Sequence, residues 1–263
     1  MRLTTWNVNS VRLRLNHLPE LLAATQADVL CLQETKVVDE AFPREAFAGF
    51  GYTHQVISGQ KNHHGVAILS RLPFAANSIR HWCDKEDCRH ASATLANGLE
   101  IHNFYVPAGG DIPDPEANEK FAHKLAFLRE TAAWFGALKA RKTPIVLAGD
   151  LNVAPLESDV WSHKQLLDVV SHTPIEVELL GKWMAAYKFV DAVRHFIPPD
   201  QRLYTWWSYR ANDWAKSDRG RRLDHVWVSP VLKESLRAAH VLKPARDWSP
   251  PSDHVPVTVE IET

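Results

Sequence analysis

The stretch TPIVLAGDLNVAP, residues 143–155, does most to decide the fold class. It begins with an apolar run, residues 143–147, that predicts a buried strand, and it turns polar at Gly149-Asp150. Directly before it lies a long amphipathic stretch, residues 115–141, whose apolar side chains recur on one side at helical spacing. A helix followed at once by a buried strand is typical of a domain in which helices pack on a sheet.

Helices and strands alternate through the rest of the chain. Apolar spacing predicts further helices over residues 13–26, 159–169 and 176–187. Apolar or alternating runs predict further strands over residues 3–8, 28–33, 65–70, 91–96, 99–106, 204–209, 223–229, 238–242 and 255–261. The dipeptide Asn97-Gly98 between two of these strands is a strong hairpin signal. We therefore expect a single α+β domain over residues 1–263, rather than a purely parallel sheet.

Composition narrows the class of protein. The chain has 263 residues, 45% of them hydrophobic, which is enough for one sizeable core. Its 11 Gly and 16 Pro in a broad residue mix exclude collagen, coiled coil and low-complexity sequence. No apolar run approaches the ~18 residues of a membrane span, and residues 1–7 hold no secretory apolar region. Three cysteines fit a reducing compartment, so we expect a cytoplasmic protein that does not act on membranes.

The charge balance limits how the protein can bind a polyanion. With 30 Lys and Arg against 31 Asp and Glu, the net charge is −1, which excludes a generally basic nucleic-acid coat. Any contact with a polyanion must come from local basic patches or from metal ions. The chain also has 14 His and 10 Trp, and a Trp ring usually fills a core or stacks on a ligand.

Polar residues follow the apolar strands at five places. The segments are Trp6-Asn7-Val8-Asn9, Leu32-Gln33-Glu34-Thr35, Gly149-Asp150-Leu151-Asn152, Arg222-Leu223-Asp224-His225 and Ser252-Asp253-His254. Taken singly, each could be a turn former or a cap. Together they supply the carboxylate and amide oxygens that Mg²⁺ prefers, along with a histidine. A Mg²⁺ ion held by few protein ligands leaves positions open for a phosphate.

These segments belong to a longer ordered set. The set also contains His64-Gly65-Val66-Ala67, Tyr105-Val106-Pro107, Val153-Ala154-Pro155, Tyr204 to Arg210 and Val255-Pro256-Val257. In this order, from residue 6 to residue 257, the chain resembles the exonuclease III family of abasic-site nucleases, within the endonuclease/exonuclease/phosphatase superfamily. The resemblance implies a DNase I-like, four-layer α/β/β/α sandwich, with two packed mixed β-sheets and the active site at one end.

The resemblance also implies roles for individual residues. The implied metal ligands, for Mg²⁺ with Mn²⁺ as a substitute, are Asn7, Glu34, Asp150, Asn152, Asp253 and His254. The implied catalytic residues are Tyr105, Asp150, Asn152, Asp224 and His254. Asp224 would pair with His254, Asn152 would donate to the phosphate, and Tyr105 would bond a phosphate oxygen or stabilise charge if ionised. The general base stays open between Asp150 and His254, and the number of metal ions stays open between one and two.

A further set of residues is predicted to contact DNA. The residues are Arg12, Arg14, Lys61, Trp206, Arg210, Arg221 and Trp248. Cations gather between residues 210 and 222 beside tryptophans, which favours DNA over a merely solvated loop. In the family an aromatic residue at the position of Trp206 lines a pocket for the abasic sugar. The opposite wall is often apolar or aromatic, but here it is Arg221, which leaves the balance between abasic-site incision and exonuclease activity open.

We therefore expect a metal-dependent DNA repair nuclease. It would act on duplex DNA as a 3′-to-5′ exodeoxyribonuclease, as an endonuclease that cuts 5′ of an abasic site to leave a 3′-OH, or as both. The alternatives are a phosphatase or phosphodiesterase of the same superfamily that acts on a non-DNA phosphate ester, and a binder without activity. We expect a monomer. The residues His81, Cys83, Cys88 and His90 could hold zinc, but their spacing favours an ordinary acidic loop.

Overall fold

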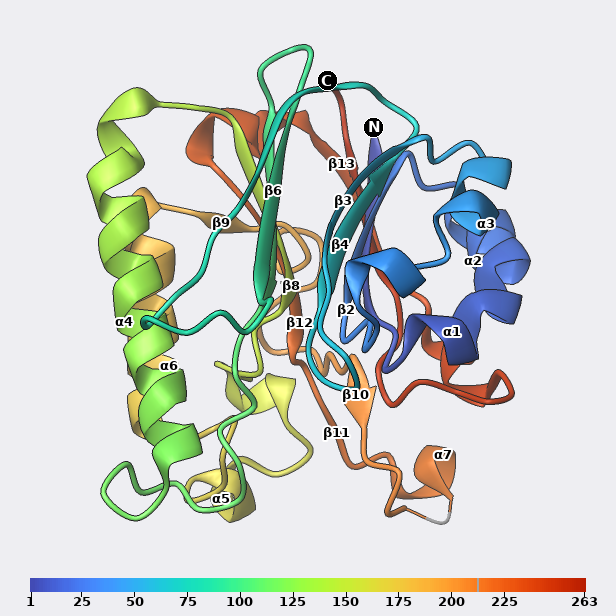
Figure 1. Cartoon of the computed structure of the whole chain (residues 1–263). Coiled ribbons are helices and arrows are strands. Elements are labelled where there is room, and N and C mark those ends of the chain that lie inside the picture. The colour runs from blue at the N-terminus through green and yellow to red at the C-terminus, as the bar shows by residue number, and fades with distance from the viewer. Residues whose placement is uncertain (212) are drawn as a thin grey trace.

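Two mixed β-sheets lie face to face, and helices cover the outer face of each (Figure 1). The computed structural model describes residues 1–211 and 213–263. In spatial order, the first sheet consists of β13 (Leu236–Val241), β14 (Val257–Ile261), β1 (Arg2–Asn7), β2 (Val29–Gln33), β4 (Val66–Ser70) and β3 (His54–Ser58). The second consists of β5 (Phe74–Ile79), β6 (His90–Leu95), β7 (Glu100–Tyr105), β8 (Ile145–Asp150), β12 (Asp224–Val228) and β9 (Val190–Asp191). A small separate ribbon pairs β10 (Trp206–Trp207) with β11 (Gly220–Arg221).

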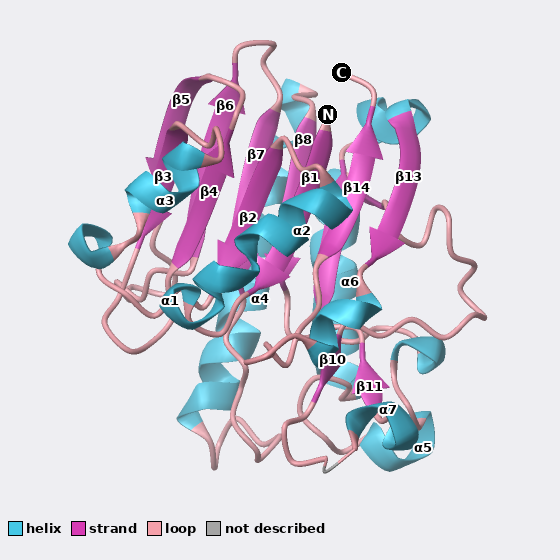
Figure 2. Ribbon diagram, turned by 90° about the vertical axis from the view of Figure 1, so that its right-hand side faces the viewer, coloured by secondary structure: helices cyan, strands magenta, loops and turns pink. Residues whose placement is uncertain are grey.

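The helices form the two outer layers. The first sheet is covered by α1 (Val11–Arg14), α2 (Leu18–Thr25) and α3 (Arg44–Gly49), as Figure 2 shows. The second sheet is covered by α4 (Glu119–Leu138) and α6 (Pro174–Tyr187), which pack against each other. The short helices α5 (His163–Leu166) and α7 (Trp214–Ser217) lie near the β10–β11 ribbon. This arrangement confirms the expected four-layer α/β/β/α sandwich. Among the described residues, no helix has the length and apolar character needed to cross a membrane.

Apolar side chains fill the spaces between the layers. The space between the sheets holds residues such as Val29, Ile68, Val146 and Val259, all fully buried. Separate apolar clusters lie between each sheet and its helices. Because β2, β4 and β8 are buried on both faces, these strands are largely apolar, as the sequence of residues 143–147 predicted.

Strand pairing brings the polar strand ends to one edge. β1 and β2 run parallel with Asn7 opposite Gln33, and β7 and β8 run parallel with Tyr105 opposite Asp150. β12 runs antiparallel to β8 and begins at Asp224, which lies opposite Asp150. The carboxyl ends of β1, β2, β7 and β8 therefore meet at the same end of the sandwich as the start of β12.

Several predicted elements are shorter than expected. The helix expected over residues 13–26 is reduced to α2, because its first turn belongs to α1 and a 3-10 turn separates the two. The helix expected over residues 159–169 is reduced to α5, because the buried Asp159 carboxylate accepts from the Leu156 amide and pairs with Arg222. The strand expected over residues 204–209 is reduced to β10. The Thr205 amide donates to the Arg221 carbonyl, whereas the Trp207 amide donates to the Asp253 carbonyl. Because the segment bonds two different stretches of chain, it forms no long ladder with either of them.

Some short elements were not expected from the sequence. They include α3, α7, the strands β3, β5, β9 and β11, and the 3-10 helices η2 (Asp39–Ala41), η4 (Glu157–Asp159), η5 (Pro230–Ser235) and η6 (Lys243–Asp247). Two further 3-10 helices, η1 (Leu15–His17) and η3 (Lys139–Arg141), lie within the helical stretches expected over residues 13–26 and 115–141. β5 is a mostly exposed edge strand, so its sequence carries little of the apolar signal that marks a buried strand.

Candidate active site

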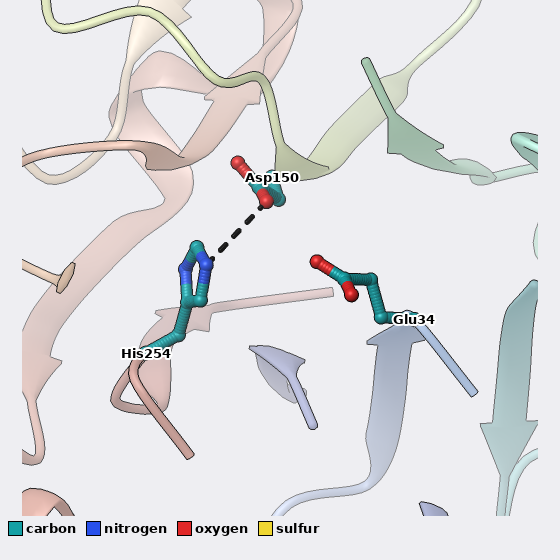
Figure 3. Close-up of side chains that lie close together, drawn as sticks. All are labelled: Glu34, Asp150 and His254. Atoms are coloured by element: carbon teal, nitrogen blue, oxygen red, sulfur yellow. Dashed lines mark ion pairs between the residues drawn. The ribbon is translucent and has the colours of Figure 1, made fainter. Parts of the chain in front are cut away.

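Glu34, Asp150 and His254 point toward one another at the end of the sandwich where the strand ends meet (Figure 3). Each offers one ligand atom, and these atoms all lie within 4.8 Å of one another. His254 Nε2 lies 3.6 Å from the Oδ2 atom of Asp150. The predicted strand-end residues thus come together from β2, β8 and the segment before β14.

Asn7 connects the two carboxylates. Its Nδ2 atom donates to Glu34 Oε1 over 2.8 Å and to Asp150 Oδ2 over 2.9 Å. Its Oδ1 atom accepts from the Asn9 amide. Asn7 is fully buried, so its side-chain amide fixes the spacing between Glu34 and Asp150.

Glu34 has a cationic partner that the sequence did not single out. Lys36 Nζ lies 2.9 Å from Glu34 Oε2. Burial alone would raise the pKa of Glu34, but the charge of Lys36, with the hydrogen bonds from Asn7 and Lys36, lowers that pKa below its ordinary value. Glu34 is therefore held as an anion, the form that a metal ligand requires.

The backbone around this group takes a conformation that non-glycine residues seldom adopt. The φ angles of Asn9, Glu34, Lys36, His64 and Asn152 lie between 43° and 57°. Such left-handed residues are uncommon outside glycine and cluster at functional sites, because the surrounding structure must hold them there. Other non-glycine residues with positive φ, such as Gln26, Lys142 and Lys188, lie away from the site, so this conformation accompanies the acidic group without being confined to it.

Asp224 and His254 form a buried pair. The two side chains meet through Nδ1 and Oδ2 at 2.8 Å, and Thr205 Oγ1 donates to the same oxygen over 2.6 Å. Burial alone would lower the pKa of His254, but the charges of Asp224 and Asp150 raise it to about 10. The two carboxylates thus favour the charged ring, and Nε2 is the ring nitrogen that faces Asp150.

Asp150 is almost completely buried. Burial raises its pKa, and although the charge of His254 opposes this rise, the charges of Asp224 and Glu34 add to it. The backbone amide of Asn152 donates to Asp150 Oδ1 over 3.0 Å. Asn152 Nδ2 donates to the Val106 carbonyl over 2.9 Å and to Asp150 Oδ2 over 3.2 Å.

Tyr105 lies beside the acids and keeps its proton. Burial and the charges of Glu34 and Asp150 raise its pKa well above the ordinary value. The Arg89 guanidinium, 4.9 Å from the ring centroid, opposes this rise but does not cancel it. Of the two roles expected for Tyr105, the electrostatics favour a neutral hydroxyl that donates a hydrogen bond.

The donor set fits a hard divalent cation. Glu34 and Asp150 supply carboxylate oxygens, and a cation between them would relieve the repulsion that raises the Asp150 pKa. His254 supplies the third ligand atom of this group; it could bind a cation only after losing its proton, which the charges of Asp224 and Asp150 oppose by raising the His254 pKa. Asp253 is bonded elsewhere, since its oxygens accept from Asn9 Nδ2 over 3.0 Å and from Trp206 Nε1 over 2.9 Å.

A cavity of about 640 Å³ opens beside the acidic group. Three of the predicted DNA contacts line it, namely Trp206, Arg210 and Arg221. The Arg221 guanidinium lies 5.2 Å from the Trp206 ring centroid and donates to Val170 O over 3.0 Å and to Ser171 Oγ over 2.8 Å. Arg221 is thus fixed in the cavity wall rather than free in solvent.

The other predicted DNA contacts lie outside that cavity lining. Arg12 and Lys61 are exposed. Arg14 is buried, and its guanidinium donates to the Asn9 carbonyl, the Tyr209 hydroxyl and the Pro251 carbonyl. Trp248 packs edge-on against Trp6, with ring centroids 5.9 Å apart. The Arg14 guanidinium is thus occupied by internal acceptors, whereas Trp248 is half-buried; their contacts with DNA stay predictions.

The cysteine and histidine segment does not form a metal site among the described residues. His90 is stacked on Phe104 with ring centroids 4.1 Å apart, and Cys88 Sγ donates to the Gly59 carbonyl. These four side chains are absent from the described group whose ligand atoms could share an ion. The ordinary loop is therefore the better interpretation of residues 81–90.

A four-layer sandwich with acids, amides and a charged histidine at one end defines the class of metal-dependent phosphoester hydrolases. The sequence model of the Endonuclease/Exonuclease/phosphatase family matches residues 4–254, and the chain belongs to this family. Within it, the chain is a DNA repair nuclease of the exonuclease III type, as the sequence predicted.

The chain is similar to individual relatives over its whole length. The chain is 30% identical to exodeoxyribonuclease III of Haemophilus influenzae, over 100% of both chains. It is 32% identical to a solved AP endonuclease from Archaeoglobus fulgidus, with a TM-score of 0.91 and 100% of both chains covered. It is 31% identical to the 3′ phosphatase NExo from Neisseria, solved with a product DNA hairpin, again with a TM-score of 0.91 and full coverage of both chains.

Proposed function

We propose that this protein uses Mg²⁺ to hydrolyse phosphodiester bonds of duplex DNA, with Mn²⁺ as a substitute. It cuts 5′ of abasic sites to leave a 3′-OH, and it removes nucleotides from 3′ ends. The observation that carries the proposal is the meeting of Glu34, Asp150 and the Asp224–His254 pair beside a cavity lined by Trp206 and three arginines, Arg210, Arg219 and Arg221. The AP endonuclease and the DNA-bound relative support DNA as the substrate.

The residues of the chain divide the chemistry among them. Asp150 orients and deprotonates the attacking water, because its raised pKa suits a general base near neutral pH. His254 is charged, so it stabilises the negative phosphate and does not compete as the base. Asn152 and Tyr105 donate hydrogen bonds to the phosphate oxygens. Glu34, with Asn7 and Asp150 beside it, would hold a Mg²⁺ ion, which would supply positive charge next to the phosphate.

Other side chains bind the DNA. We propose that the face of Trp206 stacks against the extruded sugar or the terminal nucleotide, with Asp253 holding its indole. Arg210 neutralises the backbone phosphates near the cavity, and Arg12 and Lys61 do so farther out. The protein would work as a monomer in the cytoplasm, where its three free cysteines stay reduced.

A terminal phosphate ester is a second candidate substrate. Arg221 and Arg210 place positive charge in the cavity. The family pattern instead leads one to expect a compact sugar pocket with an apolar or aromatic wall at the position of Arg221. A cation there suits the two negative charges of a 3′-phosphate better than it suits an uncharged abasic sugar. The Neisseria relative with phosphatase activity supports this reading.

One assay separates these activities. The protein is incubated with Mg²⁺ and three duplexes that carry an abasic site, an undamaged recessed 3′ end or a 3′-phosphate, with EDTA as the control. The proposal predicts Mg²⁺-dependent incision 5′ of the abasic site and shortening of the recessed end. Release of phosphate alone would reassign the enzyme to the second candidate, and no reaction on any duplex would refute both.

A further inference from the structure

Lys124 is a buried cation outside the acidic group. It lies on α4 and its side chain is fully buried. Its Nζ atom lies 2.5 Å from Glu176 Oε1 on α6, and it donates to the Asn152 carbonyl over 2.7 Å and to the Ala108 carbonyl over 3.2 Å. All three proton positions of the ammonium group thus have acceptors.

Glu176 links Lys124 to the loop before α6. The Ser171 amide donates to both of its carboxylate oxygens over 2.9 Å. The Thr173 amide and hydroxyl donate to Oε2 over 3.1 Å and 2.7 Å. The ion pair therefore joins three loops that border the active-site cavity, through Ala108, Asn152 and Ser171, which all line it.

Lys124 is one of three buried donors along a single backbone stretch. The carbonyls of Asn152, Val153 and Ala154 accept from Lys124 Nζ, His225 Nε2 and His172 Nδ1, over 2.7, 2.8 and 2.6 Å respectively. A carbonyl only accepts, so each ring nitrogen here carries the proton. The backbone after Asp150 is thus held by side chains from α4, from β12 and from the loop before α6.

These hydrogen bonds restrain Asn152, which has a proposed role in catalysis. Asn152 has a φ angle of 53°, a conformation that costs free energy unless the surroundings impose it. Its Nδ2 atom donates to the Val106 carbonyl over 2.9 Å and to Asp150 Oδ2 over 3.2 Å, and the proposed contact with the phosphate would replace the longer of these bonds. The position of this amide therefore matters, since a misplacement of 1 Å can cost about a hundredfold in rate. A buried ion pair is a poor source of stability, because apolar residues of similar volume often serve as well. A role in geometry explains its presence better than a role in stability does.

We propose that the Lys124–Glu176 ion pair is a positioning unit that fixes Asn152 for catalysis. Neither residue touches the substrate, and the pair acts through the Asn152 carbonyl and the loops that it joins. The predicted effect of the ion pair on the catalytic rate rests on the proposed function. The predicted effect of the ion pair on the geometry of Asn152 does not depend on the substrate.

Two variants test the inference. Glu176→Gln is isosteric and keeps an acceptor for the Ser171 and Thr173 amides, so it should fold. Lys124→Met combined with Glu176→Gln removes both charges and both carbonyl contacts. Arg194→Met is the matched control, because Arg194 also forms a buried ion pair, with Asp159, but donates to none of the three loops.

Each variant is melted to establish folding and then assayed on the abasic duplex. In the double variant kcat should fall at least about tenfold while KM stays within about threefold, because orientation is lost and binding is not. In Glu176→Gln kcat should fall by about threefold or more, and in Arg194→Met it should stay at the parental value. In nuclear magnetic resonance spectra, the side-chain amide signals of Asn152 should shift in both Glu176 variants and stay in place in the control.

The outcomes separate this inference from the proposed function. A parental kcat and unmoved Asn152 signals in Glu176→Gln would overturn the inference, even if the double variant failed to fold. If the parental protein cleaved no DNA but the Asn152 signals still shifted, the proposed function would fail and the positioning of Asn152 would stand.

Discussion

His254 and Asp224 meet through a 2.8 Å hydrogen bond at the buried end of the sandwich, and the free edge of the imidazole lies 3.6 Å from Asp150. The ring is thus enclosed between two acids that come from β12 and β8. The acids favour the charged form of the ring by raising its pKa, and we propose that proton removal therefore falls to Asp150. The division of roles between these residues is the centre of the proposed mechanism.

The pair should act as one unit in catalysis. His254→Asn and Asp224→Asn should each lower kcat by at least about 10², the lower range for positioned acid–base groups. The double variant should lose little more than either single variant, because each change already disables the pair. Single-turnover rates on an abasic duplex provide the measurement. Strictly additive losses would show that the two residues work separately.

Removal of Asp224 should also change the titration of His254. The pKa of His254 in the folded protein is raised from 6.5 to about 10, so the stabilisation it provides is complete below pH 6.5 and is lost as the pH rises through about 10. Asp224→Asn removes the main stabilising charge, so the pKa should fall and the stability should depend less on pH within this window. Resonance titration of the ring, with the exposed Asp200→Asn as a control, measures the shift. An unchanged His254 pKa would contradict this electrostatic account.

Glu34 should control the response to metal. Glu34→Ala should lose most activity at low Mg²⁺ and recover part of it at high Mg²⁺, because a ligand is lost while the apolar core is untouched. Activity across a Mg²⁺ series is compared with that of Glu45→Ala, which removes an exposed glutamate on α3. Full activity of Glu34→Ala at micromolar Mg²⁺ would rule out the role.

Trp206 and Arg221 should determine substrate choice. Trp206→Ala should cost roughly 1–3 kcal/mol of stacking and should weaken abasic incision more than cleavage of a minimal phosphodiester that carries no base. Arg221→Leu makes the opposite wall apolar, so incision should rise relative to exonuclease activity and phosphate release. The ratios of these rates are measured on paired duplexes across a salt series. If Arg221 only neutralises a phosphate, its loss should instead reduce all activities together and flatten their salt dependence.

Much of the site could be predicted because its residues follow strands. Asn7, Glu34 and Asp150 each end an apolar run or come directly after one, and parallel pairing brings such ends together. The sandwich topology came from the family resemblance, because periodicity alone does not specify which strands are neighbours. The catalytic and metal-binding roles remain predictions that the variants above test.

Other features depend on contacts that no local pattern reveals. Lys124 reads as one more charge on an amphipathic helix, yet the fold buries it against Asn152. Arg14 reads as a cation near the first motif, yet three internal acceptors take up its guanidinium. Thr205 and Lys36 likewise gain their roles from partners brought together in the fold, Asp224 and Glu34.

Incision of a duplex with one abasic-site analogue is the most direct test of the central claim. With Mg²⁺, the parental protein should make a single cut 5′ of the analogue and leave a 3′-OH that a polymerase can extend, and His254→Asn should make at least about 10²-fold less product. An intact duplex after incubation with the parental protein, together with hydrolysis of a non-DNA phosphate ester, would contradict the account.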